Sequence, residues 1–327
     1  MKAVWYRSFG KAKEVLQYSE QEIRNPGPGE VRVKLSFSAV NPSDVKKRNG
    51  ASPGLLAQGF VIPNSDGAGV IDATGEGVDP KRAGERVWVY NGQHGRHMGT
   101  SAEYITLPQE QAVFLPDEAD LSTGACLGIP AMTAHRCVMA DGPVRDRIIL
   151  VTGGAGRVGY YAIQLAKQSG ARVIATAGSD ASMRHCEEAG ADLVVGHPSG
   201  NTAKTILDYT KGRKVDRVVE GDFGANLPYL LDLMATGGVI ASYASMTEPE
   251  PSFPFYRLMY KDLTLRTVLV YEMPGEAKQA AIEDITDLLG KGVLKHRIAE
   301  TYPLSESVRA QEAIEQGGLY GCVLLGI

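Results

Sequence analysis

The sequence is poor in cysteine and has no long apolar run. Its four cysteines are scattered over 327 residues without a C-x-x-C spacing, which argues against a disulfide-rich secreted domain and a cysteine-based zinc module. No stretch approaches the roughly 18 apolar residues of a membrane span, and the charged start MKAVWYRSFGKAKEV lacks the apolar core of a signal peptide. We therefore expect a reduced, cytoplasmic protein with no membrane partner.

An excess of charge of one sign is also missing. The 34 basic and 38 acidic residues leave a formal net charge of −4, so the composition does not indicate a nucleic-acid partner. Glycine, by contrast, is abundant, with 38 residues and no collagen period, which predicts many tight turns. At about 150 residues per domain, the length predicts two domains.

The two halves of the chain have different patterns. The first 120 residues contain short apolar runs bounded by turn residues, at 31–40, 67–74 and 85–90, and predict an antiparallel, barrel-like or sandwich domain. From about residue 145, buried apolar strands alternate with amphipathic helices, which predicts a doubly wound parallel sheet. Its six expected strands are 147–154, 171–178, 191–196, 214–221, 237–244 and 263–271. We expect the tail 322–327 to rejoin the first domain, so that the α/β domain is an insertion.

A glycine-rich loop follows the first of these six strands. Gly154, Gly156 and Gly159 match G-x-G-x-x-G between a strand and a helix. We expect Gly154 to take the tight turn, Gly156 to admit a pyrophosphate and Gly159 to let the helix pack closely. The helix N-terminus would attract the phosphates, whereas the alternative is that the glycines serve packing alone.

The residues after the second α/β strand bear on which dinucleotide binds. Ser179 stands 20 residues after Gly159, where NAD-binding proteins usually carry an acid. Asp180 follows and could equally cap a helix, and Arg184 could pair with a 2′-phosphate. This combination favours NADP(H), with a solvated helix charge as the alternative for Arg184.

Other candidate chemistry in the sequence is sparse. His94 and His97 form the one close histidine pair, in a glycine-rich stretch without a nearby cysteine, and we interpret it as a polar loop rather than a metal site. The segment NPSD places Asn41, Ser43 and Asp44 after a strand. Such a loop can hold an amide against a ligand, or it can be simple turn chemistry.

Together these motifs resemble the zinc-independent quinone oxidoreductases, the ζ-crystallin-like branch of the medium-chain dehydrogenase/reductases. The resemblance runs almost end to end. The segments that carry it are NPSDVKKRNG (41–50), DGAGVIDATGEGV (66–78), GERVWVY (84–90), LGIPAMTAHR (127–136), ILVTGGAGRVGYYAIQLAK (149–167) and VDRVVEGDFGANL (215–227).

The resemblance implies a mainly β, GroES-like catalytic domain over 1–123 and 265–327, with a Rossmann domain for NADPH over 124–264. Zinc-using relatives carry a catalytic Cys at the place of Asn41 and a His-Glu pair at Ser65 and Asp66. Because these ligands are missing here, we expect no metal. Many relatives also carry a pocket tyrosine where Ala51 or Ser52 stands, and T-G-K where Tyr320-Gly321-Cys322 stands.

The resemblance also implies individual coenzyme contacts. Gly156, Arg157 and Val158 would meet the pyrophosphate, and Gly178, Ser179 and Arg184 the adenosine ribose and its phosphate. Asn41 and Thr133 would face the nicotinamide. The rest of the coenzyme path would be lined by His197, Asn226, Tyr243, Ala244, Ser245, Leu269 and Val270.

We accordingly expect an NADPH-dependent reductase that passes a hydride to quinones or activated enones. The amide of Asn41 would stabilise the oxyanion of the acceptor, since a hydroquinone anion hardly needs a dedicated acid. The alternatives are an enoyl-thioester or small-enone reductase, which would need a proton donor, and a non-catalytic NADPH-binding protein. The apolar strands 239–244 and 263–271, expected at the sheet edge, predict a homodimer.

Overall fold

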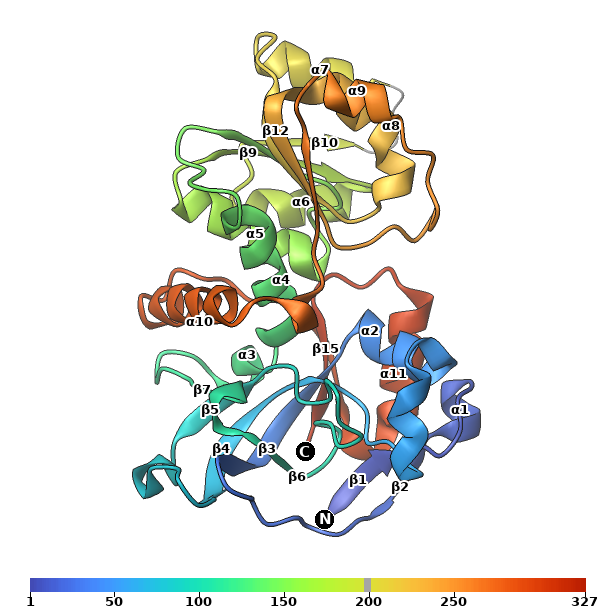
Figure 1. Ribbon diagram of the computed structural model, residues 1–327, viewed down its shortest axis with the longest axis vertical. Coiled ribbons are helices and arrows are strands. Elements are labelled where there is room, and N and C mark those ends of the chain that lie inside the picture. Colours follow the sequence, from blue (N-terminus) through green and yellow to red (C-terminus); the bar gives the residue numbers. More distant parts are fainter. Residues whose placement is uncertain (197–200) are drawn as a thin grey trace. The chain divides into compact units, whose positions relative to one another are not determined.

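The computed structural model describes residues 1–196 and 201–327, so His197 lies outside the described residues. The chain forms two compact units. Unit 1 comprises residues 1–129 and 282–327, and unit 2 comprises residues 130–281 (Figure 1). The α/β part is thus an insertion, as the sequence predicts, while the domain boundaries 123/124 and 264/265 stay a prediction.

Unit 1 is built around the long strand β3 (Glu30–Val40), whose Val31, Val33 and Leu35 are buried. β3 pairs antiparallel with β4 (Asp66–Thr74), β6 (Tyr104–Pro108) and β15 (Cys322–Gly326). The predicted mainly β architecture and its first three strands are confirmed. The remaining strands are β1 (Lys2–Trp5), β2 (Gln17–Glu20), β5 (Arg86–Val89), β7 (Ala112–Phe114) and β14 (Ile298–Pro303).

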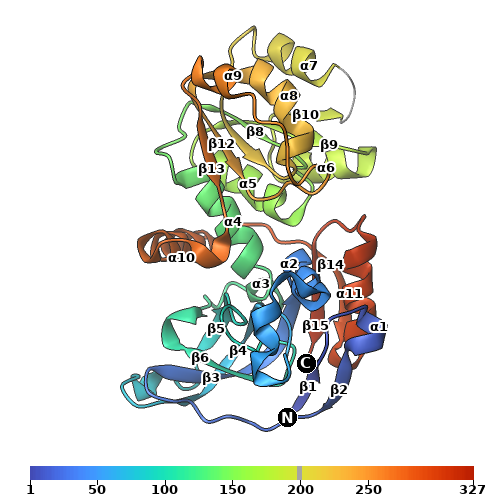
Figure 2. The same cartoon turned by 45° about the vertical axis from the view of Figure 1, so that its right-hand side comes forward.

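The last strand of the chain returns to the first sheet. Leu324 of β15 pairs with Ala39 of β3, and Figure 2 shows the red β15 beside the blue strands of unit 1. This confirms that the tail rejoins the first domain. The neighbouring β14 and helix α11 (Ser307–Gln316) are absent from the sequence prediction; β14 is mostly exposed and offers no apolar alternation.

The other helical segments of unit 1 are short, and the ones nearest the NPSD segment are α2 (Pro42–Lys46) and the turn Lys47–Ala51 that follows it. Pro42 occupies the first helical position, where its missing N–H costs nothing. The remaining segments are α1 (Ala12–Val15), α3 (Leu121–Gly124) and the 3₁₀ turns Pro53–Gln58, Pro80–Arg82, Gln109–Gln111 and Leu304–Glu306.

Unit 2 contains a six-stranded parallel sheet in the order β10-β9-β8-β11-β12-β13. Its strands are β8 (Ile148–Val151), β9 (Arg172–Ala177), β10 (Leu193–Gly196), β11 (Val215–Glu220), β12 (Met234–Ser242) and β13 (Thr264–Thr267). All six predicted strands are present. The order reverses between β8 and β11, and ligands bind at the carboxyl ends of strands at such a point.

Two details of the predicted sheet are wrong. The run 263–271 ends as a strand at Thr267, and Val270–Glu272 forms a 3₁₀ turn. Of the two strands expected at the sheet edge, β13 lies there and β12 does not, because β12 pairs on both sides. An apolar run alone does not tell a strand from the buried turn that follows it.

Helices connect the strands of unit 2. They are α5 (Arg157–Gln168), α6 (Asp180–Glu188), α7 (Thr202–Tyr209), α8 (Phe223–Leu233) and α9 (Phe255–Met259). In the chain, α4 (Gly128–Met139) precedes β8 and α10 (Gly275–Gly290) follows β13. α5 and α6 pack on each other, as do α7 and α8. Because the crossovers are right-handed, the reversal of strand order places these two pairs on opposite faces of the sheet.

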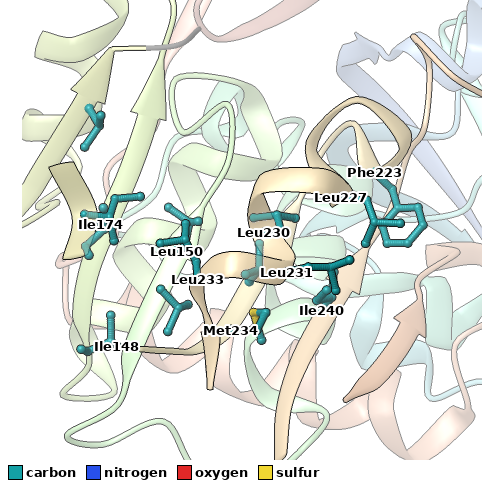
Figure 3. Close-up of a cluster of buried hydrophobic side chains, with 14 of the residues drawn as sticks. Ile148, Leu150, Ile174, Phe223, Leu227, Leu230, Leu231, Leu233, Met234 and Ile240 are labelled. Atoms are coloured by element: carbon teal, nitrogen blue, oxygen red, sulfur yellow. The ribbon is translucent and has the colours of Figure 1, made fainter. Parts of the chain in front are cut away.

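One hydrophobic core of unit 2 lies between α8 and the sheet (Figure 3). Leu230 and Leu233 of α8 are fully buried against Leu150 and Ile240 of the strands. Burying one such leucine contributes about 1.5–3 kcal/mol. This core holds the carboxyl ends of the strands in register, which is where the candidate site is built.

Candidate functional site

The glycine loop joins the end of β8 to the start of α5. Gly153 has φ +58°, and the loop is tied to β9 because Gly153 N donates to Thr176 Oγ1 at 3.1 Å and Gly154 N to Thr176 O at 2.9 Å. The positive φ falls on Gly153, while Gly154 is a central residue of the turn that Gly156 N closes by donating to Gly153 O at 2.9 Å. Gly154 also packs closely, since a Cβ there would lie 2.9 Å from Cys186 Sγ.

The end of the loop is equally intolerant of side chains. A Cβ at Gly159 would lie 2.7 Å from Gly153 O, which fits the expected close packing of helix and loop. Gly156 is the exposed N-cap residue of α5, and Arg157 and Val158 are its first two helical residues. The N-terminal end of α5 thus offers a partial positive charge to an anion.

A cavity of about 500 Å³ opens beside this loop. It is lined from the carboxyl ends of four parallel strands, by Thr152 after β8, Gly178 after β9, Asp222 after β11 and Tyr243 after β12, and by Asn226 of α8. Of the predicted coenzyme residues, Gly178, Asn226 and Tyr243 come together here. The cavity occupies the topological switch point of the sheet.

The start of α6 borders the cavity at Gly178. Ser179 is the N-cap residue, its Oγ accepting a bond from Ser182 N while Ser179 N donates to Ser182 Oγ at 2.8 Å. Asp180, weighed as a helix cap from the sequence, is instead the first residue of the helix. Arg184 is exposed one turn further along, and within the described chain its guanidinium makes no hydrogen bond or ion pair.

Two acids at the carboxyl end of β11 organise the opposite wall, and the sequence prediction missed both. Glu220 is fully buried, and its Oε1 accepts a 2.8 Å bond from Asn226 Nδ2; burial raises the pKa of this carboxyl. Asp222 accepts bonds from Met246 N at 2.8 Å and Thr247 N at 3.0 Å. Charged residues directly after an apolar strand were the available signal.

The segment after β12 is fixed by the same wall. Tyr243 N donates to Glu220 O at 3.1 Å, Ala244 O accepts from Phe223 N at 3.0 Å, and Ser245 Oγ accepts from Gly224 N at 3.0 Å. Burial raises the pKa of the Tyr243 hydroxyl. In contrast, Leu269 is 58% exposed and Val270 is buried, and neither belongs to the described lining of the cavity.

In unit 1, the predicted residue Asn41 belongs to a buried polar cluster. Asn41 Nδ2 donates to Asp66 Oδ2 at 2.9 Å, and Asn41 N donates to Asp44 Oδ2 at 2.8 Å. Lys47 Nζ donates to Ser65 Oγ at 3.1 Å. Asn41 and Asp66 are 2% and 0% exposed, so this cluster is part of the interior of the unit. The other residue expected at the nicotinamide, Thr133, is buried in α4 of unit 2.

Burial controls the charges of this cluster. It raises the pKa of Asp66 to about 8, with a further increase from Asp44, and it lowers the pKa of Lys47. At neutral pH the Asp66 carboxyl is therefore mostly protonated. The sequence named Asp66 only as the place of a missing zinc ligand.

Elsewhere, His97 packs edge-on against Phe60 with ring centroids 5.1 Å apart, and burial lowers its pKa. Within residues 1–196 and 201–327, no three His, Cys, Asp or Glu side chains gather in a way that could hold a metal ion. No helix of the described chain has both the length and the apolar character needed to cross a bilayer.

Two known protein families match the chain, and their matched ranges correspond to the two units. Residues 27–117 match the family described as alcohol dehydrogenase GroES-like domain, and residues 158–287 match the family described as zinc-binding dehydrogenase. The first match lies in unit 1 and the second covers most of unit 2.

Similar proteins match over the full length. A quinone oxidoreductase of Pseudomonas aeruginosa is 27% identical, covering 99% of both chains. A mycobacterial structure complexed with NADPH is 26% identical with a TM-score of 0.88, and a structure described as an NAD-dependent alcohol dehydrogenase is 28% identical with a TM-score of 0.86; both cover 100% of both chains.

The glycine loop at the switch point, the GroES-like sheet and the full-length matches agree with one another. The chain belongs to the medium-chain dehydrogenase/reductase superfamily, in its ζ-crystallin-like group of quinone oxidoreductases.

Proposed function

We propose that this protein is an NADPH-dependent reductase that delivers a hydride to quinones or similar activated enones without a metal ion. The observation that carries the proposal is the cavity of about 500 Å³ beside the glycine loop. The loop leaves no room for side chains at Gly154 and Gly159, so that α5 begins close to the end of β8 and its N-terminal N–H groups can bind a pyrophosphate.

The residues of unit 2 fit a dinucleotide. Gly156, Arg157 and Val158 would hold the pyrophosphate, and Gly178 with Ser179 would meet the adenosine ribose. Asn226, Tyr243, Ala244 and Ser245 would line the path from the wall that Glu220 and Asp222 hold in place. When bound, the coenzyme would supply the hydride, while the protein supplies orientation. Thr133, Leu269 and Val270 stay in the proposal from the family resemblance alone.

We favour NADPH over NADH because of charge at the start of α6. Arg184 is exposed and makes no ion pair within the described chain, so its guanidinium is available for a 2′-phosphate. The hydroxyl of Ser179, by contrast, is engaged in capping α6. The relative complexed with NADPH supports this preference, although another similar structure is described as NAD-dependent.

We propose that the reaction needs no metal ion because the side chains around Asn41 are poor zinc ligands. An amide, a hydroxyl and one carboxyl, from Asn41, Ser65 and Asp66, replace the thiolate and imidazole ligands that zinc prefers. The Ser65 hydroxyl already accepts from Lys47, and the Asp66 carboxyl from Asn41. Instead of a Lewis acid, the second amide hydrogen of Asn41 would stabilise the oxyanion that forms on the acceptor.

A small-enone or enoyl-thioester reductase is the second candidate. Its carbanion would need a proton, and burial raises the pKa of Asp66, beside Asn41, to about 8, so that an acid is present at neutral pH. A non-catalytic NADPH-binding role stays the third alternative, because Ala51 and Ser52 stand where many relatives have a pocket tyrosine.

Turnover with two acceptors separates these functions. We expect NADPH oxidation with 1,2-naphthoquinone to exceed that with crotonyl-CoA, and prolonged dialysis against 1,10-phenanthroline to leave the rate unchanged. The consumption of NADPH is followed at 340 nm. Faster turnover of crotonyl-CoA would favour the enone reductase, coenzyme binding without turnover of any quinone or enone would favour the third role, and a rate restored only by zinc would exclude metal independence.

The glycine loop can be tested by one added methyl group. In Gly159→Ala the new Cβ meets Gly153 O at 2.7 Å, so the loop must move, and we expect the Kd for NADPH to rise at least tenfold in calorimetry. Gly275→Ala is the matched control, because a Cβ there has open space. Equal NADPH affinity in both variants would show that the loop does not hold the coenzyme.

The coenzyme preference can be tested at Arg184. Removal of its guanidinium in Arg184→Ala would take away a charged partner of the 2′-phosphate, worth about 1.5–3 kcal/mol. We therefore expect the KM for NADPH to rise about ten- to a hundredfold and the KM for NADH to stay within twofold. Arg172→Ala, at the opposite end of β9, is the control; a similar change for both coenzymes would contradict the assignment.

We also propose a homodimer through the edge of the unit 2 sheet. Among residues 1–196 and 201–327, no strand pairs with the outer side of β13. More than half of the exposed large apolar side chains in the described ranges lie between residues 246 and 269, around this strand. They include Tyr256 and Tyr260 of the α9 region, whose rings stack with centroids 6.0 Å apart. A second copy would cover both the edge and this aromatic patch.

Light scattering checks the assembly. We expect the mass of a dimer from the unmodified protein and of a monomer from Tyr256→Glu/Tyr260→Glu, because a buried interface would then hold two unpaired charges. Tyr209→Glu, on α7 beside the opposite sheet edge, should stay dimeric. A monomeric unmodified protein would reject the proposal.

A further inference from the structure

The bond between Asn41 and Asp66 is made possible by strand register. β3 ends at Val40 and β4 begins at Asp66, and Ala39 is the register partner of Asp66. Asn41 therefore follows β3 beside the first residue of β4, and its Nδ2 reaches Asp66 Oδ2 at 2.9 Å. Both side chains are buried, so water does not compete for this bond.

The Asp66 carboxyl is itself held firmly. Its Oδ2 accepts a second bond from Ile129 N at 2.8 Å. Its Oδ1 lies against Gly128, where a Cβ would come within 2.1 Å. The carboxyl therefore has a fixed acceptor oxygen, Oδ2, which receives two N–H groups, and a second oxygen that is buried and has no hydrogen-bond partner within the described chain.

This arrangement decides where a proton on Asp66 must sit. Oδ2 faces two donors, from Asn41 and Ile129, so it has to keep its lone pairs. A proton taken up by the carboxyl therefore goes to Oδ1. As a result, Oδ2 remains an acceptor for the Asn41 amide whether the acid is ionised or neutral, although the bond is stronger to the carboxylate.

Two other charged groups face this pair. Asp44 of α2 accepts from Asn41 N at 2.8 Å, which fixes the backbone end of the asparagine. Lys47 donates to Ser65, the neighbour of Asp66, and its charge favours the ionised acid whereas that of Asp44 opposes it. Asn41 is thus held at its backbone N–H by Asp44 and at its side-chain amide by Asp66.

We infer that Asp66 is the positioning residue for Asn41: it binds one amide hydrogen, the amide oxygen faces Asp44 N in the capping box of α2, and the other amide hydrogen is thereby held in the orientation in which it is offered to a ligand. An unsupported asparagine amide rotates between two orientations. The flipped orientation would set the amide oxygen against Asp66 Oδ2, which is repulsive. The inference rests on the proposed role of Asn41 at the acceptor, where a donor works best when it is preorganised.

A double-mutant cycle tests whether Asp66 acts through Asn41. With NADPH and 1,2-naphthoquinone, we expect Asp66→Ala to lower kcat about tenfold, by analogy with the larger cost of losing an oxyanion donor itself. In an Asn41→Ala background the same substitution should lower kcat less than twofold. Asp72→Ala, on the exposed side of β4, is the control. An equal loss in both backgrounds would overturn the inference and leave a merely structural role.

The isosteric Asp66→Asn variant provides a second test in case the Asp66→Ala protein does not fold. It keeps a carbonyl oxygen that can accept from Asn41 and Ile129 but loses the titrating proton. We expect it to retain most of kcat, with the KM for NADPH within twofold of the unmodified protein. If Asp66→Asn lost as much kcat as Asp66→Ala, charge rather than orientation would be the contribution of Asp66.

Nuclear magnetic resonance of ¹⁵N-asparagine-labelled protein gives a readout without coenzyme. The side-chain amide signals of Asn41, assigned by their loss in Asn41→Ala, should stay two distinct peaks and shift with a midpoint near pH 8, as expected from the raised pKa of Asp66. The shift should vanish in Asp66→Asn and persist in Asp72→Ala. If the Asn41 amide signals shift neither with pH nor in Asp66→Ala, the positioning role is refuted, whether or not an acceptor is turned over. If turnover fails but these signals shift as expected, only the proposed function is refuted.

Discussion

The close approach of helix α5 to the end of strand β8 is the contact on which unit 2 depends. At Gly154 and Gly159 an added Cβ would lie within 3 Å of neighbouring atoms, and Gly153 adopts a positive φ that other residues avoid. These glycines let the helix start directly over the carboxyl end of the strand. The partial charge of the helix and the exposed N–H groups then lie beside the cavity at the switch point.

Much of unit 2 follows from its sequence, because its strands are continuous apolar runs and its helices are amphipathic. Errors arise where neighbouring residues have the same character. Gly153 and Gly154 belong to one turn, and only the backbone angles show that the positive φ falls on Gly153. Ser179 and Asp180 are both good caps, and the reciprocal bonds with Ser182 decide for Ser179. β14 is mostly exposed, so its strand pairing leaves no apolar pattern in the sequence.

The cluster around Asn41 could be predicted only in part. The NPSD segment marks a stiff polar turn, which draws attention to Asn41 and Asp44. Asp66, however, is 25 residues away from Asn41, and the two meet because β3 and β4 pair in one particular register. A shift of that register by a single residue would turn Asp66 to the other face of the sheet. Hydrophobic patterns do not resolve register this finely, so the bond could not be read from the sequence.

The place of β15 in the first sheet has a consequence for the order of folding during synthesis. β3 is complete by residue 40, whereas its partner β15 begins at Cys322. All of unit 2 leaves the ribosome in between. Unit 2 is one continuous segment, so it can fold as soon as it emerges, while in unit 1 the end of β3 at residues 37–40 must wait for its partner β15. The part of the chain that is translated first is therefore the last to be finished.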